Sequence, residues 1–296
     1  MRSARTPKSK AALSRLPLGL LALLALTGAK AWAGDQPPAQ LSGGGLSIGF
    51  KLDQGRLRQT FFLPENLVGR TTSVLPKDLL AGVEVAVQIT GRNWNAHHIQ
   101  KRIGGSPGTE LIFVRHEQRA ASGGRHDVLV QRSVETGLVI ESHYRFYDGV
   151  PVVRRWSTVR NEGPAPLGVD HVSSAMVYGF ANGGSKPLEE RIRYHIAYNS
   201  WKSEAQWRTA SPAELGFYDT GSFNLNAVAF NNVGTMSSMA RLPLAMAENL
   251  DLGTTLFWQI EHHGAWHWES SNTSGGTSYF YFGGPDALFA DAWEEL

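Results

Sequence analysis

The chain contains a series of short stretches in which apolar residues alternate with other residues, and residues that favour turns separate these stretches. Residues 83–89 and 138–146 both alternate in this way, so each can bury one face of a β-strand. Asp148-Gly149 then predicts a tight turn into the stretch 151–159. No apolar pattern after the first 33 residues keeps a helical period, and the chain carries 32 glycines. The sequence therefore predicts an all-β fold with few helices, built as a large two-sheet antiparallel β-sandwich.

The first 33 residues have the three parts of a secretory signal peptide. Basic residues precede an apolar run at 16–26, and the small-residue triplet Ala31-Trp32-Ala33 follows it. An uncleaved membrane anchor is disfavoured because the apolar run is short and no charged stop follows it. We expect cleavage after Ala33, a mature domain over residues 34–296, and a periplasmic or secreted bacterial protein.

The net charge and the absence of cysteine limit the kinds of partner expected for the mature chain. Residues 1–33 hold six of the 28 basic residues and none of the 26 acidic ones, which leaves 22 basic residues against 26 acidic ones, a net charge of −4. A chain without a basic surplus is not expected to bind nucleic acid or anionic lipid. The chain has no cysteine, so it has no disulfides and no cysteine for a lipid anchor.

The densest group of aromatic and polar residues spans residues 258–269. His263-Gly264 predicts a two-residue hairpin turn, with Trp258 on one arm and Trp266 and Trp268 on the other. Strand alternation then gives an aromatic face and a polar face. Burial in the core is the expected role of most of these tryptophans, and stacking on a sugar ring is the functional alternative, with Trp266 as its candidate.

The same segment contains side chains of metal-binding type. His262, His263, His267 and Glu269 could be weighed as zinc or copper ligands, but they lie on both sides of the turn at spacings that match no closed motif. A solvated hairpin face explains them as well. We therefore expect no metal and no other cofactor.

A second polar-aromatic group lies at residues 197–208. Trp201, Glu204 and Trp207 could face one way on a turn or short helix, which would place a carboxylate between two rings and make all three candidates for carbohydrate contact. Glu204 and Glu269 could be nominated as a glycosidase pair, but structural roles explain both. Residues 93–98 form a third polar and aromatic patch, for which a structural and a functional role are both open.

An ordered set of segments resembles the N-terminal β-supersandwich domain of glycoside hydrolase family 36, the family of α-galactosidases also called melibiase-like. The resemblance covers roughly residues 41–296. It is carried by residues 148–155 (DGVPVVRR), 159–163 (VRNEG), 199–208 (NSWKSEAQWR), 215–216 (LG), 242–245 (LPLA), 258–269 (WQIEHHGAWHWE) and 284–286 (GPD), the last shortly before Trp293.

The resemblance implies retaining α-galactosidase chemistry in a catalytic (β/α)₈ barrel that follows the sandwich and holds both catalytic aspartates. The sequence stops at Leu296, so we expect a non-catalytic portion, truncated before the barrel. Its expected role is to scaffold a barrel and an oligomer, with a separately encoded barrel, a homo-oligomer, and a galactoside or oligosaccharide as possible partners. The alternatives are a free-standing carbohydrate-binding β-sandwich and a small metal-dependent hydrolase built on the histidine hairpin.

Overall fold

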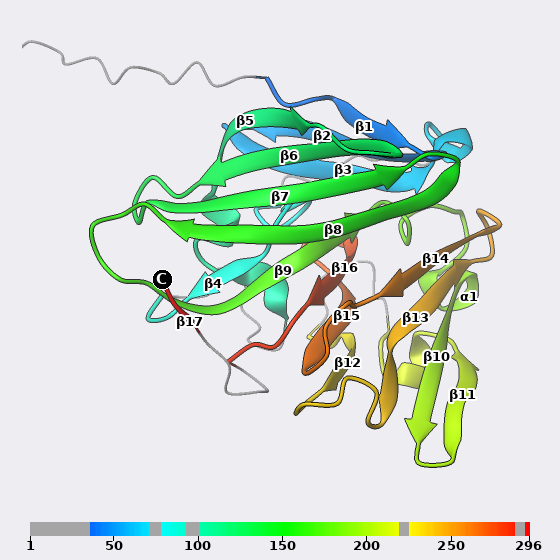
Figure 1. Ribbon diagram of the computed structural model, residues 1–296. Helices are drawn as coiled ribbons and strands as arrows, with labels where there is room; N and C mark the ends of the chain where they lie inside the picture. Colours follow the sequence, from blue (N-terminus) through cyan, green and yellow to red (C-terminus); the bar gives the residue numbers. More distant parts are fainter. Residues whose placement is uncertain (1–35, 71–77, 93–100, 219–224, 288–293) are drawn as a thin grey trace, which may run out of the picture. The chain divides into compact units, whose positions relative to one another are not determined.

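Strands dominate the molecule, as the alternating pattern predicts. A computed structural model of the 296-residue chain describes residues 36–70, 78–92, 101–218, 225–287 and 294–296 (Figure 1). Every strand pair in this part is antiparallel. The only α-helix there is the short α1 (Leu188–Arg191), and no described helix is long and apolar enough to span a membrane. The all-β prediction is confirmed, but the sandwich contains four sheets rather than two.

Two sheets come from the first half of the described chain. The first has the order β1-β2-β3 and the second the order β5-β6-β7-β8. Their strands are β1 (Gln40–Gly43), β2 (Leu46–Asp53), β3 (Arg56–Pro64), β5 (Ile112–Arg119), β6 (Gly124–Arg132), β7 (Leu138–Tyr147) and β8 (Val150–Asn161). Single 3-10 turns lie at η1 (Glu65–Leu67), η2 (Arg102–Gly104) and η3 (Gly108–Glu110).

The second half supplies most of the other two sheets. The third has the order β11-β10-β13-β14, and the fourth has the order β12-β15-β16-β9-β17 with β4 also paired to β9. Their strands are β4 (Val87–Ile89), β9 (Gly168–Tyr178), β10 (Ile192–Ser200), β11 (Ser203–Ala210), β12 (Val228–Asn232), β13 (Arg241–Asn249), β14 (Thr254–Gln259), β15 (Trp266–Asn272), β16 (Ser278–Gly283) and β17 (Glu294–Glu295). A fourth 3-10 turn is η4 (Ala213–Leu215).

The strand predictions around the Asp148-Gly149 turn are confirmed. Strands β7 and β8 pair directly from Leu138↔Asn161 to Phe146↔Val153. Gly149 has φ 70°, a left-handed conformation that glycine adopts without a Cβ penalty. The strand expected at residues 83–89 forms only at β4. Before β4, Val83 makes a single β-bridge to Arg58 of β3, and Val83, Glu84 and Val85 are all buried.

The hairpin expected at His263-Gly264 is wrong. Strand β14 pairs with β13 in the third sheet, whereas β15 pairs with β12 and β16 in the fourth. The segment between them therefore crosses from one sheet to the other. It is held by hydrogen bonds from the Ile260 N–H to the Pro243 carbonyl (2.7 Å) and from the Ser237 N–H to the His263 carbonyl (3.1 Å).

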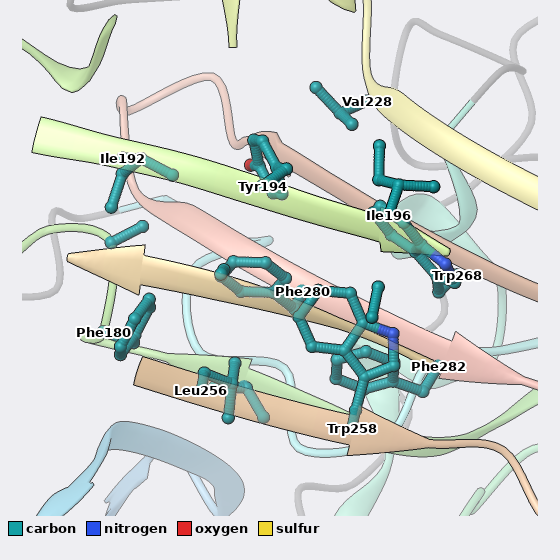
Figure 2. Packing of buried hydrophobic residues seen from close by; sticks show 14 of the residues in the cluster. Phe180, Ile192, Tyr194, Ile196, Val228, Leu256, Trp258, Trp268, Phe280 and Phe282 are labelled. Atoms are coloured by element: carbon teal, nitrogen blue, oxygen red, sulfur yellow. The ribbon is translucent and has the colours of Figure 1, made fainter. Parts of the chain in front are cut away.

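This crossover lets both sheets contribute to one aromatic core (Figure 2). Trp258 from β14 meets Trp268 from β15 edge to face, with ring centroids 5.0 Å apart and planes at 73°. Trp266 is also fully buried, and Phe280 and Phe282 of β16 pack beside Trp258. The expectation that most of these tryptophans belong to the core is confirmed for all three. Burying each such ring contributes roughly 1.5–3 kcal/mol.

A second core joins the first and second sheets. Ile48 and Phe50 of β2 pack with Leu129 of β6 and with Tyr144 and Phe146 of β7. Phe50 and Tyr144 meet edge to face at 5.7 Å. This geometry is favoured because the positive edge of one ring faces the negative face of the other.

A buried carboxylate connects this half of the molecule. Glu84 is almost completely buried, and its oxygens accept hydrogen bonds from Gln131 Nε2 (2.7 Å), Ser142 Oγ (2.7 Å), the Tyr144 hydroxyl and Arg155 Nη2 (2.7 Å). These four donors come from β6, β7 and β8. A buried carboxylate is tolerated only when it is paired and its lone pairs are satisfied, so this one segment fixes three strands at once.

Arg155 extends the network to the neighbouring sheet. Its Nη1 donates to the Met176 carbonyl of β9 (2.8 Å), and its guanidinium carbon lies 4.1 Å from the centroid of the Tyr144 ring. The carbonyl of Met176 also accepts a hydrogen bond from Gln59 Nε2 of β3 (3.0 Å). Residues from β3, β7, β8 and β9 therefore meet around a single ion pair.

We predict that Glu84→Gln lowers the free energy of unfolding by about 3–5 kcal/mol, because it leaves the buried Arg155 guanidinium without a charge partner. Urea unfolding followed by tryptophan fluorescence measures the change. The matched control is Glu65→Gln on the exposed η1 turn, which should shift the unfolding free energy by less than about 0.5 kcal/mol. Equal effects of the two substitutions would contradict a structural role for the Glu84 ion pair.

Candidate functional site

The candidate residues at 197–208 lie on a β-hairpin rather than on a short helix. Strands β10 and β11 are joined at Trp201 and Lys202, and Lys202 has φ 62°. Strand β11 is an edge strand of the third sheet, and nearly all of its side chains are exposed. The Trp201 side chain at the tip is 87% exposed and that of Trp207 is 47% exposed. The hairpin therefore presents two large rings to solvent.

The strand geometry does not form a carboxylate clamped between two rings. Trp207 lies directly opposite Ala197, so its ring is on the sheet face away from the core-facing Ile196. Ala205 has φ 52° and donates its N–H to Asn199 Oδ1 (3.2 Å), which interrupts regular alternation beside Glu204. Glu204 is exposed and has no ion-pair partner in the described part of the chain.

Trp266 does not suit the role of sugar contact that its aromatic type suggested. Its side chain is fully buried in the aromatic core, and its Nε1 donates to the Ser237 carbonyl (2.7 Å). Stacking on a sugar needs one open ring face, and this environment leaves none. The pattern around Trp266 could not reveal this, because local alternation does not show which sheet packs against the ring.

Glu269 is a buried structural carboxylate. Its Oε1 accepts hydrogen bonds from the Arg102 N–H (2.8 Å) and the Tyr279 hydroxyl (2.8 Å), and its Oε2 lies 3.1 Å from His267 Nε2. Burial acts to raise the pKa of Glu269, but the hydrogen bond and charge of His267 and the charge of Arg102 outweigh it and hold the pKa below its ordinary value. Glu204 on the surface and Glu269 in the interior therefore do not flank a common substrate bond.

The neighbourhood of Glu269 contains further buried charges. Arg102 Nε contacts Asp286 Oδ2 (3.0 Å), and Lys101 Nζ donates to the Asn272 carbonyl (2.7 Å). Burial lowers the pKa of Lys101 to about 8, although the charge of Glu269 opposes this shift. The expectation of a solvated polar face at His267 and Glu269 is wrong, because the segment at Lys101 and Arg102 covers that face.

The metal-capable side chains do not form one site. His262 and His263 stack on each other with ring centroids 4.9 Å apart, and His262 Nδ1 accepts the Gly264 N–H (3.1 Å). His267 instead lies in the buried network with Glu269. No three metal-ligating side chains gather anywhere in the described residues. The patch at residues 93–98 lies outside the described residues.

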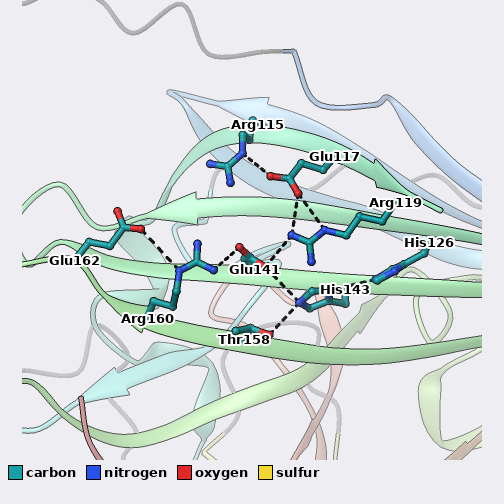
Figure 3. A network of polar contacts seen from close by, with 9 residues as sticks. All are labelled: Arg115, Glu117, Arg119, His126, Glu141, His143, Thr158, Arg160 and Glu162. Atoms are coloured by element: carbon teal, nitrogen blue, oxygen red, sulfur yellow. Dashed lines mark hydrogen bonds and ion pairs between the residues drawn. The ribbon is translucent and has the colours of Figure 1, made fainter. Parts of the chain in front are cut away.

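A second polar site, which the sequence did not indicate, crosses one face of the β5–β8 sheet (Figure 3). Glu117 contacts Arg115 (2.7 Å) and Arg119 (2.8 Å), and Glu141 contacts Arg119 (3.1 Å) and Arg160 (2.5 Å). Hydrogen bonds from Arg119 and Arg115 hold the pKa of Glu117 below its ordinary value. A general acid needs a raised pKa, so this network is suited to stabilising the sheet rather than to acid catalysis.

The same face carries a histidine pair stacked on a tryptophan. His126 Nε2 lies 3.1 Å from His143 Nδ1, and His143 Nε2 lies 3.0 Å from Thr158 Oγ1. The His143 ring is parallel to that of Trp156, at 4.6 Å and 4°. Burial, and after it the charge of Arg119, lower the pKa of His143 to about 4, while Glu141 acts in the opposite direction. Cross-strand register creates this group, so local sequence gave no signal for it.

Comparison with known proteins identifies the fold. No family model and no curated protein matches the sequence. Among solved structures, the family 36 α-galactosidase AgaA of Geobacillus stearothermophilus aligns with a TM-score of 0.61 at 13% identity, over 87% of this chain and 38% of that one. The α-galactosidase of Lactobacillus brevis gives 0.61 at 14% identity, over 86% and 38%. AgaB of G. stearothermophilus gives 0.61 at 13%, over 89% and 39%.

These values confirm the expected likeness to family 36 α-galactosidases at the level of the fold. The chain spans less than two-fifths of the length of each of these enzymes. The likeness extends over most of this chain, so the shared fold is that of its sheets as a whole and not of one motif. It leaves the chemistry of the site to be argued from the residues themselves.

We predict that the histidine pair makes stability depend on pH. The unfolded chain binds a proton at His143 with a pKa of about 6.5, whereas the folded value is about 4. The unfolded state therefore holds more protons between these values. The contribution of His143 is fully present above pH 6.5 and falls away as the pH drops towards 4, by on the order of 2 kcal/mol.

Urea unfolding of the wild type and of His143→Gln at pH 7 and pH 4.5 measures this dependence. The substitution should reduce the loss of stability in acid, since glutamine does not titrate. His262→Gln, at the stacked surface pair, is the control and should keep the wild-type pH dependence. Parallel losses in the wild type and His143→Gln would rule out His143 as the source.

Proposed function

We propose that this chain is the non-catalytic N-terminal sandwich of a secreted α-galactosidase-like glycoside hydrolase and that it scaffolds a catalytic barrel and an oligomer. The observation that carries the proposal is the fold likeness to three α-galactosidases, which spans 86–89% of this chain but only 38–39% of theirs. The part of those enzymes without a counterpart here is long enough to hold a separate catalytic domain.

The carboxylates of the sandwich support a non-catalytic role. Retaining hydrolysis needs an acid and a nucleophile roughly 5 Å apart on either side of the sugar bond. Glu84 and Glu269 are buried and saturated with donors, and Glu117 and Glu141 are paired with arginines. Glu204 is exposed without a second carboxyl in contact in the described residues. Each of these carboxylates is therefore buried, paired with arginine, or without a second carboxyl beside it.

The exposed hairpin at β10 and β11 is the proposed contact for the saccharide. Aromatic rings stack on the apolar face of a pyranose, and Trp201 and Trp207 offer such rings at the edge of the third sheet. Solved complexes of AgaA variants hold raffinose and stachyose. We extend that ligand class, α-galactosyl oligosaccharides, to this hairpin, with Glu204 as a hydrogen-bond acceptor beside the rings.

A free-standing carbohydrate-binding sandwich is the second candidate function. The observation that favours it is the 87% exposure of Trp201, because large rings open to solvent are typical of binding surfaces. Under this function the hairpin would bind sugar without any barrel. The two candidates differ in whether a catalytic domain is needed as a partner.

We predict that the mature chain binds raffinose weakly and hydrolyses no α-galactoside. Titration of raffinose, followed by tryptophan fluorescence, should show binding that falls about tenfold, equivalent to about 1.4 kcal/mol, in Trp201→Ala. Turnover of an aryl α-galactoside by the same preparation should be absent.

Tyr218→Ala removes another exposed ring and is the control for the binding measurement. Glu204→Gln and Glu269→Gln test the absence of catalysis. Steady turnover that either substitution abolishes would place an active site inside the sandwich and would overturn the proposal. Raffinose binding that Trp201→Ala leaves unchanged would remove the hairpin from it.

We also predict that the exported protein begins at Gly34. The basic start, the short apolar run and the Ala31-Trp32-Ala33 triplet support this cleavage site. N-terminal sequencing of the periplasmic or secreted protein checks it. Ala33→Arg should block cleavage, whereas Gln36→Arg adds the same charge outside the triplet and should not. An intact Met1 on the protein in the cytoplasm would contradict export.

A further inference from the structure

The side of the third sheet that faces away from the aromatic core is apolar and open to solvent. Met246 of β13 lies directly opposite Phe257 of β14, and both alternate with residues of the core. Leu244 lies on the same side of β13, and Trp207 lies on it at the edge strand β11. These four residues define the outer face of the third sheet. The Phe257 side chain is 54% exposed, so no part of the described chain covers this ring.

The β5–β8 sheet shows how this protein covers a sheet face that meets water. There, ion pairs among Glu117, Arg119, Glu141 and Arg160 run across three of the four strands (Figure 3). An antiparallel sheet with one solvated face normally places polar side chains on that face. The centre of the outer face of the third sheet carries no such charged covering. An apolar patch of this kind with a polar border marks an interaction surface.

The border of the outer face carries one positive and one negative charge. Arg193 of β10 lies directly opposite Glu248 of β13, on the same side of the sheet as Met246. Within the described residues, Arg193 makes hydrogen bonds only through Nη1, to the carbonyls of Glu189 and Ile192 (2.7 Å each). One oxygen of Glu248 contacts Nε2 of His195 (3.3 Å). Both charged groups therefore keep atoms that can bind a further partner.

These two charges make the outer face complementary to itself. Two copies that pack face to face about a two-fold axis make each contact twice. An axis that runs along the strands between β10 and β13 places Arg193 over the partner's Glu248, and Glu248 over the partner's Arg193, because the two residues lie at the same height on the central strands. The apolar centres then cover each other, as in two aligned sheets packed about 10 Å apart.

The size of the outer face indicates how strong such a contact can be. Four strands about 4.8 Å apart, each with about seven residues at about 3.3 Å per residue, give a face of roughly 19 by 23 Å. This flat area is about half of the roughly 800 Å² of accessible surface that each partner buries in a standard interface, before the relief of the side chains is added. A contact of this size favours a reversible dimer.

We propose that the outer face of the third sheet binds the same face of a second copy of this chain and forms a two-fold dimer. Met246 and Phe257 form the apolar centre of the contact, and Arg193 with the partner's Glu248 fixes its register. A second copy is the occupant because the face carries both signs of charge at matching positions, whereas a partner of one charge would leave one of them opposed. The biological role of the dimer rests on the proposed function, whose oligomer it supplies with a surface.

The test is sedimentation equilibrium of the full mature chain, residues 34–296, over a range of protein concentrations. The wild type should show a reversible equilibrium between monomer and dimer. Phe257→Glu should raise the dissociation constant of the dimer roughly thirtyfold or more, because it places a carboxylate in the apolar centre of the contact. Val152→Glu is the matched control, since it makes the same change at another half-exposed apolar side chain, on β8, and should leave the dissociation constant unchanged.

Charge reversal tests the register of the two copies. Arg193→Glu and Glu248→Arg should each raise the dissociation constant about tenfold, because each places like charges over one another across the two-fold axis. The variant with both changes should dimerise as the wild type does, since opposite charges meet again. Circular dichroism shows whether each variant folds, and the charge variants keep the inference testable if Phe257→Glu does not fold.

A wild type that stays monomeric would leave the face to another partner, such as a catalytic barrel, and would overturn the inference. A dimer that Phe257→Glu leaves as tight as before would place the contact elsewhere on the molecule and would also overturn it. A double charge variant as weak as the single ones would overturn the two-fold register. Failure here is distinguishable from failure of the proposed saccharide function, because raffinose binding depends on Trp201 in the hairpin turn, and Phe257→Glu should leave raffinose affinity unchanged.

Discussion

The buried carboxylate of Glu84 is the interaction on which the first half of the structure depends. A charge inside a protein is stable only if donors surround it, and those donors here come from β6, β7 and β8. Arg155, its charge partner, also reaches the backbone of β9. Neighbouring sheets are thus held in one relative position by groups that cannot separate without leaving a charge unpaired.

In the second half of the molecule, packed aromatic rings hold the neighbouring sheets together. Trp258 and Trp268 come from different sheets and meet in one core because the chain crosses between the sheets after β14. This arrangement leaves β11 outside the core, as an edge strand with nearly every side chain exposed. The tryptophans at 258–268 are therefore buried in the core, whereas Trp201 and Trp207 on the outer hairpin stay exposed.

The polar residues also divide into those that are satisfied within the fold and those that are exposed. Glu84 and Glu269 are saturated with donors inside the fold, and Glu117 and Glu141 are paired with arginines on the β5–β8 sheet. Arg208 is the opposite case, since it is exposed on the edge strand β11 and forms no ion pair with the described residues. Burial among several donors therefore marks the carboxylates that hold the fold, whereas exposed groups without a partner face solvent.

From the sequence we could predict the all-β class, strands β7 and β8 with the turn between them, and the burial of most tryptophans at 258–268, because alternation and turn chemistry act over a few residues. Which strands pair could not be predicted. The missed crossover at His263-Gly264 depends on the pairing of β14 with β13 and of β15 with β16. The burial of His267 and Glu269 depends on a segment far away in the chain, at Lys101 and Arg102. Whether a polar side chain meets water or another side chain depends on contacts between strands that no local pattern encodes, so this distribution emerges only in the folded protein.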